Sequence, residues 1–292
     1  MISLNPELCT DCLECRNVCP DYVFAVTSAD GRSRKLHLRY PEQCCACGHC
    51  IAVCPSAALS HPDLPPEGFV PLAQADIEPE EMQALLLSRR SIRHYRPETV
   101  PDEKIEMLLL GATHAGTSSN GQTEGFIVIR DRATLRRLEL LVVDTLWRAG
   151  FRFLGGTGIV SRLLARKYGP ELIRQYRPYH GIFKHRRENG ELEGAVFRNA
   201  PVVIVAHGLR ANQLAGANCA LALRNVELLA ATMGLGTCWV GFLVAAASRS
   251  RKIGDGIGLE RDRQILGALM LGYPGEQYHA SIPRKPRPTR WI

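Results

Sequence analysis

A repeated cysteine pattern near the N-terminus constrains this chain most strongly. Nine of the eleven cysteines in the 292 residues fall between Cys9 and Cys54. Five positions recur at an offset of 35 residues: Cys9, Cys12, Cys15, Cys19 and Pro20 are repeated as Cys44, Cys47, Cys50, Cys54 and Pro55. An odd number of cysteines packed into one segment argues against the disulfide framework of a secreted fold. The two distant cysteines, Cys219 and Cys238, are expected to be small buried residues.

The doubled spacing C-x2-C-x2-C-x3-C-P is typical of bacterial ferredoxins with two [4Fe–4S] clusters. Three thiolates two residues apart can wrap one face of a cubane, and the fourth lies beyond that loop and binds the other cluster. The predicted ligand sets are Cys9, Cys12, Cys15 and Cys54 for one cluster and Cys44, Cys47, Cys50 and Cys19 for the other. A pair of zinc sites is the alternative, which this triple-plus-one spacing disfavours. Cys45 is interpreted as a small buried residue rather than a spare ligand.

Composition and charge narrow the class of protein. The chain is 46% hydrophobic and 22% charged, which is ordinary for a globular protein. Its net charge of +7 is concentrated in residues 88–96, 162–187 and 281–292. Local positive charge suits specific anions better than a nucleic acid. There is no signal-peptide pattern and no apolar run long enough to span a bilayer, so we expect a cytoplasmic protein with no membrane or nucleic-acid partner.

The pattern along the chain predicts three parts. Residues 1–60 form the cluster domain, residues 61–79 form a linker with five prolines, and residues 80–292 form a larger domain. Helices are expected at 79–89, from Pro101 onward, at 132–147 and at 215–233, and strands at 126–130, 202–206 and 265–272. Residues 148–199 are basic and show no clear period. Intermingled helices and strands predict an α/β or α+β fold for the larger domain.

Two polar clusters in the larger domain could bind a ligand. Ser88–Arg93 places three guanidinium groups and two hydroxyls at a helix end, which suits a phosphate group. The alternative for this cluster is a solvated helix end favoured by the helix dipole. Residues 117–122 then offer small hydroxyls and two side-chain amides, and amides suit the edge of a flat heterocycle.

At these residues the chain resembles the FMN-dependent nitroreductase family. The resemblance is carried by residues 89–129, by APVVIVA (200–206), by residues 217–242 with GLGTCWVG, by GALMLGYP (267–274) and by PRKP (283–286). With the cysteine module in front, the whole chain resembles the ferredoxin–nitroreductase fusions. This resemblance implies an α+β fold, in which a small two-cluster ferredoxin-type domain precedes a nitroreductase-like α+β sandwich. It also implies an intertwined homodimer with FMN at the subunit interface.

The resemblance further implies roles for individual residues. Arg89, Ser91 and Arg93, with Arg90 as a helper, would contact the FMN phosphate and ribityl groups. Ser118, Ser119, Asn120 and Gln122 would hold the ribityl chain and the isoalloxazine edge, commonly from the partner subunit. The loop near flavin N5 would comprise Gly236, Trp239, Val240 and Gly241, and the C-terminal cation at the phosphate would be Arg284 or Lys285. The chain departs from the family at Gln122-Thr123-Glu124, on the substrate side.

These observations predict an FMN-dependent oxidoreductase that passes electrons between two [4Fe–4S] clusters and FMN. Clusters carry single electrons, whereas FMN collects two and delivers a hydride equivalent from N5, so no side chain is assigned as the reacting group. The expected acceptor is a nitroaromatic, a quinone or an enone, and the expected donor is an external ferredoxin or NAD(P)H. One alternative is an electron-transfer or redox-sensing protein without turnover. Another is a different flavin chemistry of the family, such as reductive dehalogenation. The basic region 148–199 is either a solvated face or a dock for an acidic electron carrier.

Overall fold

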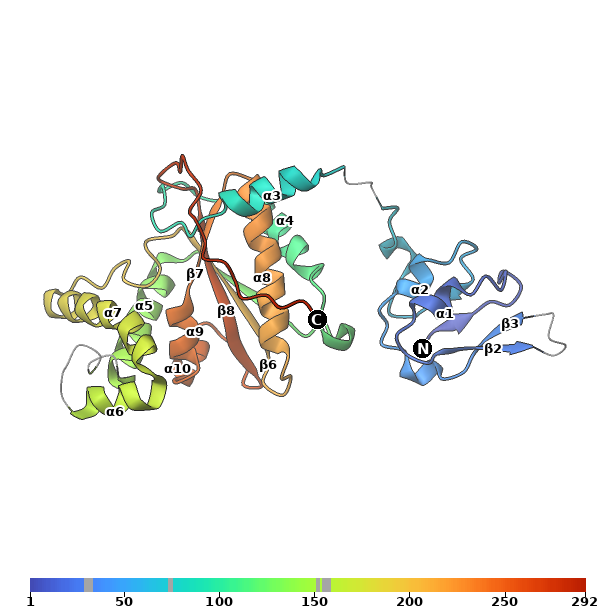
Figure 1. Cartoon of the computed structure of the whole chain (residues 1–292), viewed down its shortest axis with the longest axis horizontal. Helices are drawn as coiled ribbons and strands as arrows, with labels where there is room; N and C mark the ends of the chain where they lie inside the picture. The colour runs from blue at the N-terminus through green and yellow to red at the C-terminus, as the bar shows by residue number, and fades with distance from the viewer. Residues whose placement is uncertain (29–33, 73–75, 151–152, 154–158) are drawn as a thin grey trace. The chain divides into compact units, whose positions relative to one another are not determined.

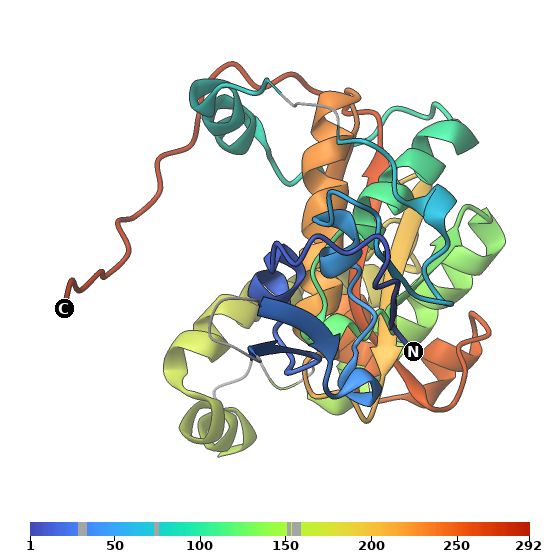
Figure 2. The same cartoon turned by 90° about the vertical axis from the view of Figure 1, so that its right-hand side faces the viewer.

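The computed structural model describes residues 1–28, 34–72, 76–150, 153 and 159–292. Contacts divide the chain into two compact units (Figures 1 and 2). The first unit comprises residues 1–76 together with 117–122, and the second comprises residues 77–116 and 123–292. No helix in the described ranges is both long enough and apolar enough to cross a membrane.

The first unit is built from two short antiparallel ladders and two short helices. Its elements are β1 (Ser3–Leu4), α1 (Glu14–Val18), β2 (Phe24–Ser28), β3 (Arg34–Leu38), η1 (Pro41–Gln43), α2 (His49–Ala52), β4 (Leu59–Ser60) and η2 (Pro66–Gly68). Strand β1 pairs with β4, and β2 pairs with β3. A small core under these strands includes Ile2, Val23, Phe24 and Leu59.

The 35-residue sequence repeat is also a repeat of backbone conformation. Asp11 and Leu13 have φ angles of 54° and 67°, and their counterparts Ala46 and Gly48 have φ angles of 51° and 77°. Helices α1 and α2 begin directly after the second of these left-handed residues. Each half therefore presents its cysteines from the same tight loop and helical turn.

The second unit contains an antiparallel sheet with strand order β5-β6-β8-β7. Its strands are β5 (Gly125–Ile129), β6 (Val202–Leu209), β7 (Gly236–Trp239) and β8 (Arg263–Gly272). Three of these strands confirm the sequence expectation. Strand β7 was not anticipated, because four residues are too few to show the alternation of a strand.

Helices cover both faces of this sheet, so the α+β sandwich expectation is confirmed (Figure 1). The helices are α3 (Pro79–Ser88), α4 (Asp102–Thr113), α5 (Arg132–Ala149), α6 (Ile159–Tyr168), α7 (Pro170–Asn189), α8 (Ala215–Thr232), α9 (Gly241–Ala247) and α10 (Arg251–Asp255), and a 3-10 turn, η3 (Ser118–Asn120), falls in the first unit. Alternation along β6 sends Val203 and Val205 into the core under α5 and α9. Val202 and Ile204 point to the other face, into the core with α4 and α8.

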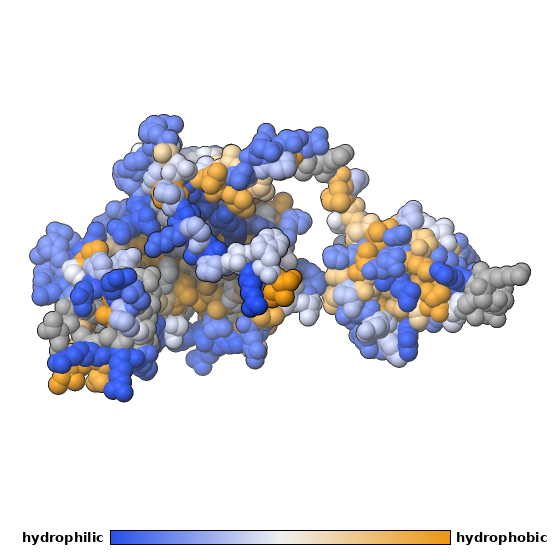
Figure 3. All heavy atoms as spheres, in the orientation of Figure 1, coloured by the Kyte–Doolittle hydropathy of each residue, from blue (hydrophilic) through white to orange (hydrophobic). Residues whose placement is uncertain are grey.

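Residues 148–199 differ from the sequence expectation, because much of this region is helical. Helices α6 and α7 bury few of their described side chains, among them Ile173 and Phe183, which are ten residues apart. So sparse an apolar stripe gives no readable period. Phe183 packs on Phe242 with ring centroids 5.3 Å apart, which fixes α7 to α9. The face visible in Figure 3 is mainly hydrophilic over these helices, with a smaller hydrophobic patch at α6.

Candidate functional site

One pocket of the first unit is lined by four cysteines from both halves of the repeat. Cys9, Cys12 and Cys15 come from the first loop and α1, and Cys54 comes from the segment after α2. Leucines of the unit core complete the wall, and the pocket holds about 280 Å³ of empty space, part of it open to solvent. This is the grouping that the spacing predicts for one cluster, whose ligation stays a prediction.

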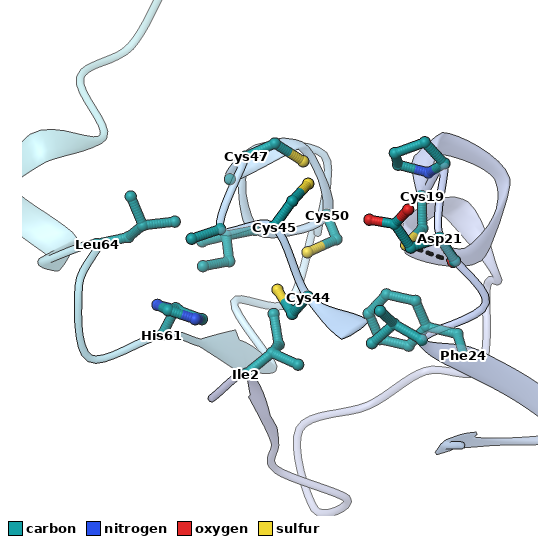
Figure 4. A pocket seen from close by; sticks show the side chains of 15 residues that line it. Ile2, Cys19, Asp21, Phe24, Cys44, Cys45, Cys47, Cys50, His61 and Leu64 are labelled. Carbon is teal, nitrogen blue, oxygen red and sulfur yellow. Dashed lines mark hydrogen bonds between the residues drawn. The ribbon is translucent and has the colours of Figure 1, made fainter. Parts of the chain in front are cut away.

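A second pocket has the complementary grouping (Figure 4). It is lined by Cys44, Cys47 and Cys50 from the second loop and α2, together with Cys19 from the first half. Its empty space is about 380 Å³, again partly open to solvent. In the described part of the chain, no three His, Cys, Asp or Glu side chains gather closely enough to hold a single metal ion. The cysteines line the two pockets instead.

Burial and mutual proximity disfavour thiolates at the centre of each set. Burial raises the pKa of the Cys15 thiol to about 11, and the nearby Cys54, Cys12 and Cys9 add to the rise. The pKa of Cys50 is likewise raised to about 12 by burial and by Cys44, Cys47 and Cys19. These neighbours are the members of each predicted set. Because a metal binds the thiolate form, loading either pocket would release protons.

Cys54 has a different environment from the other cysteines. Burial acts to raise its pKa, but hydrogen bonds from Ala58 and Ser56 outweigh burial and lower it. The Ala58 N–H donates to Cys54 Sγ at 3.3 Å, and Ser56 Oγ lies 3.7 Å from the same sulfur. Cys19, the repeat counterpart of Cys54, instead points its thiol at the Asp21 carbonyl at 2.9 Å. The two pockets are therefore chemically unequal.

Three further side chains distinguish the second pocket. Cys45 lines it and is only partly buried, so it does not fit the expectation of a buried bystander. Burial, together with the Asp21 carboxylate and the Cys47 thiol, raises the pKa of Cys45 to about 11. His61 is 8% exposed and also lines the pocket. Sequence reasoning missed Asp21 and His61. The repeat could have signalled Asp21, because its counterpart is Ser56.

In the second unit, the segment after α3 runs beside strand β7. Ser91 forms a parallel bridge with Thr237, and the Ile92 N–H donates to the Thr237 carbonyl at 2.9 Å. A Cβ atom at Gly236 would lie 2.4 Å from Ile92 Cγ1, so only glycine allows this approach. The structure therefore brings the arginine–serine motif and the Gly236–Trp239 strand together, although 145 residues separate Ser91 from Gly236 along the chain.

The arginines of this motif have distinct surroundings. Arg89 Nη1 donates to Glu227 Oε1 at 3.2 Å, and Glu227 also accepts from Arg224 at 3.3 Å. Arg90 donates to the Ala280 carbonyl, and its buried Nε has no hydrogen-bond partner among the described residues. Arg93 is exposed, and among the described residues its guanidinium makes only a long contact to the Ser91 carbonyl. The cluster therefore keeps unused donor capacity and a net positive charge.

The chain turns sharply where β7 ends. Trp239 is 39% exposed at the end of the strand, and the next residue, Val240, is 3% exposed. The Val240 N–H donates to the Ala268 carbonyl at 2.9 Å, which anchors the turn to β8. Helix α9 begins at Gly241, where a Cβ atom would meet open space.

The remaining predicted flavin contacts have different surroundings. Residues 117–122 group by contact with the first unit, where the Asn120 amide donates to the carbonyls of Cys45 and Ala46 at 3.2 and 3.0 Å. Ser119, Asn120 and Gln122 have positive φ angles of 49°, 53° and 44°, a strained conformation that is often found at functional sites. Arg284 and Lys285 lie exposed in the C-terminal segment.

The fold and these sites define a redox protein of the α+β sandwich class with a separate thiol-rich unit. The model of the nitroreductase family matches residues 86–273, and that of the 4Fe–4S dicluster domain matches residues 8–59. The chain belongs to the nitroreductase family of oxidoreductases and carries an N-terminal 4Fe–4S dicluster domain.

Individual relatives agree with this assignment. A protein of Archaeoglobus fulgidus, named as a candidate NADH dehydrogenase/NAD(P)H nitroreductase, is 23% identical over 198 residues, which cover 68% of this chain and 88% of the relative. The fold is similar to that of an FMN-bound nitroreductase of Bacteroides fragilis (TM-score 0.53, 20% identity, 73% of this chain and 98% of that one). It is also similar to an FMN-bound nitroreductase of Desulfitobacterium hafniense (TM-score 0.53, 17% identity, covering 72% of this chain and 97% of that one).

Proposed function

We propose that the chain is an FMN-dependent oxidoreductase in which two [4Fe–4S] clusters exchange electrons with FMN. Its acceptor is a small organic molecule of the nitroaromatic, quinone or enone type. The observation that carries this proposal is the joining of two cysteine-lined pockets, each with one predicted set of four ligands, to a nitroreductase domain in a single chain. Clusters transfer electrons singly and a flavin transfers them in pairs, so the fusion links the two kinds of redox chemistry.

Each pocket supplies what a [4Fe–4S] cluster needs. The four predicted ligands of each set line it from two segments, and the rest of the wall is largely apolar. Soft thiolate ligands select such clusters. We assign Cys9, Cys12, Cys15 and Cys54 to the first cluster and Cys19, Cys44, Cys47 and Cys50 to the second.

The arginine motif fits the phosphate of FMN. Arg90 Nε is buried without a partner among the described residues, and the exposed Arg93 has donors to spare. The phosphate and ribityl groups are assigned to Arg89, Arg90, Ser91 and Arg93. The flavin ring is assigned to Gly236, Trp239, Val240 and Gly241. Contacts that complete the site are assigned to Ser118, Ser119, Asn120, Gln122, Arg284 and Lys285. FMN, when bound, supplies hydride transfer from its ring. The protein then positions the cofactor and stabilises negative charge on it.

Exposed apolar side chains support a homodimer. They gather on α3, on α4 and in the C-terminal segment, and comprise Met82, Leu86, Leu87, Met107, Leu110, Ile282, Trp291 and Ile292. Large exposed apolar surfaces mark interaction sites. A second copy of the chain would cover them and complete the flavin site. The electron donor is an external ferredoxin or NAD(P)H.

An anaerobic reconstitution tests the proposal. The protein should retain FMN and iron, and stopped-flow mixing with NADH, NADPH or reduced ferredoxin should identify the donor that bleaches the flavin. The double variant Arg89→Ala/Arg93→Ala should lose FMN and acceptor reduction but keep the cluster absorbance. Arg136→Ala/Arg148→Ala is the matched control, because both arginines are exposed and form ion pairs outside the motif.

Two results would contradict the proposal. A reconstituted protein with clusters but no FMN would show that the second unit is not a flavin site. If FMN is retained and every acceptor fails while the clusters still cycle, the chain is an electron-transfer or sensing protein.

A further inference from the structure

The two halves of the cysteine repeat differ at several positions, and two of these differences place a thiol or a carboxylate in the second pocket where the first pocket has a hydroxyl. Cys45 stands where the first half has Thr10, and Asp21 stands where the second half has Ser56. Thr10 and Ser56 line the first pocket, whereas Cys45 and Asp21 line the second. The backbone conformation is repeated around these positions, so the two pockets differ in side-chain chemistry rather than in chain path.

The two exchanged residues are also in contact. The Asp21 carboxylate and the Cys47 thiol both lie near enough to Cys45 to raise the pKa of its thiol, and all three side chains line the same pocket. In Figure 4 the sulfurs of Cys45 and Cys47 lie side by side, and both residues line the pocket. The second pocket therefore offers five thiols, Cys19, Cys44, Cys45, Cys47 and Cys50, to a group that takes four.

We propose that Cys45 is a reserve ligand of the second cluster that can replace Cys47. The inference rests on the cluster assignment in the proposed function. In the exchange, a bond forms between Cys45 Sγ and iron as the bond from Cys47 Sγ breaks. The proton of the Cys45 thiol passes to Cys47 Sγ as that sulfur leaves the iron, so Cys47 leaves as a thiol and no electrons are transferred.

The first pocket has no such reserve. Thr10 occupies the place of Cys45, and a hydroxyl is a poor ligand for iron–sulfur clusters, which select thiolates. The difference gives the second cluster two ligand sets and the first cluster only one. Loss of Cys47 is therefore tolerated, whereas loss of its counterpart Cys12 is not.

Matched variants test this asymmetry after anaerobic reconstitution, with iron and sulfide per chain and the EPR spectrum of the reduced protein as readouts. Wild type and Cys45→Ala should each hold about eight iron atoms, the content of two clusters. Cys47→Ala should keep about the same content with a changed EPR signal, because the ligand geometry differs. Cys12→Ala and the double variant Cys45→Ala/Cys47→Ala should each lose about half the iron.

A gain-of-ligand variant guards against loss of folding. Thr10→Cys in the Cys12→Ala background should restore the iron content toward the wild-type value. The inference is overturned if Cys47→Ala loses as much iron as Cys12→Ala, or if it matches the Cys45→Ala/Cys47→Ala double variant. Failure of wild type itself to hold two clusters would instead remove the cluster assignment in the proposed function, so the two failures can be told apart.

Discussion

The Arg89 guanidinium is held by the buried carboxylate of Glu227, with 3.2 Å between Nη1 and Oε1. Glu227 is only 4% exposed and lies on α8, and Arg224 on the same helix contacts its other oxygen. The pair ties the segment after α3 to the central helix of the second unit. It also fixes the direction of one arginine that we assign to the FMN phosphate.

The first prediction concerns this pair. Arg89→Leu leaves a buried carboxylate with Arg224 alone, and breaking a buried pair costs about 3–5 kcal/mol, so we expect a loss of about 2–4 kcal/mol in unfolding free energy. The double variant Arg89→Leu/Glu227→Leu should recover much of that loss, because no unpaired charge stays buried. Urea unfolding of wild type, the two single variants and the double variant measures both effects. Strictly additive losses would disprove the coupling.

Glu139 on α5 provides the second prediction. Its buried carboxylate accepts N–H groups from Gly194, Val196 and Phe197 at 2.9, 3.0 and 2.8 Å. Glu139→Ala leaves three buried donors unsatisfied, and we expect a destabilisation of about 3–5 kcal/mol. Glu193→Ala is the control, since its ion pair with Arg136 is exposed and should contribute less than about 1 kcal/mol. Equal unfolding midpoints for the two variants would contradict the prediction.

Close packing at Gly236 gives a third prediction. A Cβ atom there collides with Ile92, so Gly236→Ala should push the arginine–serine segment away from β7. We expect a cost of about 1–3 kcal/mol in stability and weaker FMN retention. Gly216→Ala at the start of α8 is the control, because its Cβ meets open space. Thermal unfolding and the flavin-to-protein absorbance ratio report the two effects, and an unaltered Gly236→Ala protein would refute the argument.

A fourth prediction follows from His207 on β6. Burial and the nearby Arg263 cation lower its pKa, while Glu260 opposes them. The unfolded chain therefore binds a proton near pH 6.5 before the folded chain does, so stability falls as the pH drops through 6.5 toward the folded pKa. One such group contributes a slope of at most about 1.4 kcal/mol per pH unit. His207→Gln should flatten the decline between pH 8 and pH 5.5 in denaturant titrations, and an unchanged slope would rule the histidine out.

The fifth prediction uses Ser56, which lies 3.7 Å from Cys54 Sγ. Hydrogen bonds to ligand sulfurs are among the factors that set a cluster potential, and donation to a thiolate favours the more negative reduced cluster. Ser56→Ala should therefore lower the potential of the first cluster and leave the second unchanged, in an EPR-monitored redox titration. Ser60→Ala, whose hydroxyl pairs with Ser3, is the control. A shift confined to the second cluster would show that Cys54 is assigned to the wrong cluster.

Elements whose apolar residues repeat over short distances in the sequence were predicted, and elements without such a repeat were missed. Helix α8 and strand β6 were predicted because their apolar residues repeat within a few positions, and both are confirmed. Cys219 and Cys238 are buried as expected. Strand β7 and helices α6 and α7 were missed, because the first is too short and the others bury too few side chains to show a period.

The cysteine repeat and the order of the apolar segments can be recognised in the sequence alone. Both are patterns of spacing within a few residues, and such spacings match the periods of loops, helices and strands directly. By contrast, the folded chain is needed to see that Cys45 and Asp21 line one pocket and that Glu227 accepts a hydrogen bond from Arg89. Such pairings join residues 24 and 138 positions apart. They depend on how the packed elements cross. A buried charge or polar group is costly unless it is paired, and the fold determines which partner is close enough to pair with it.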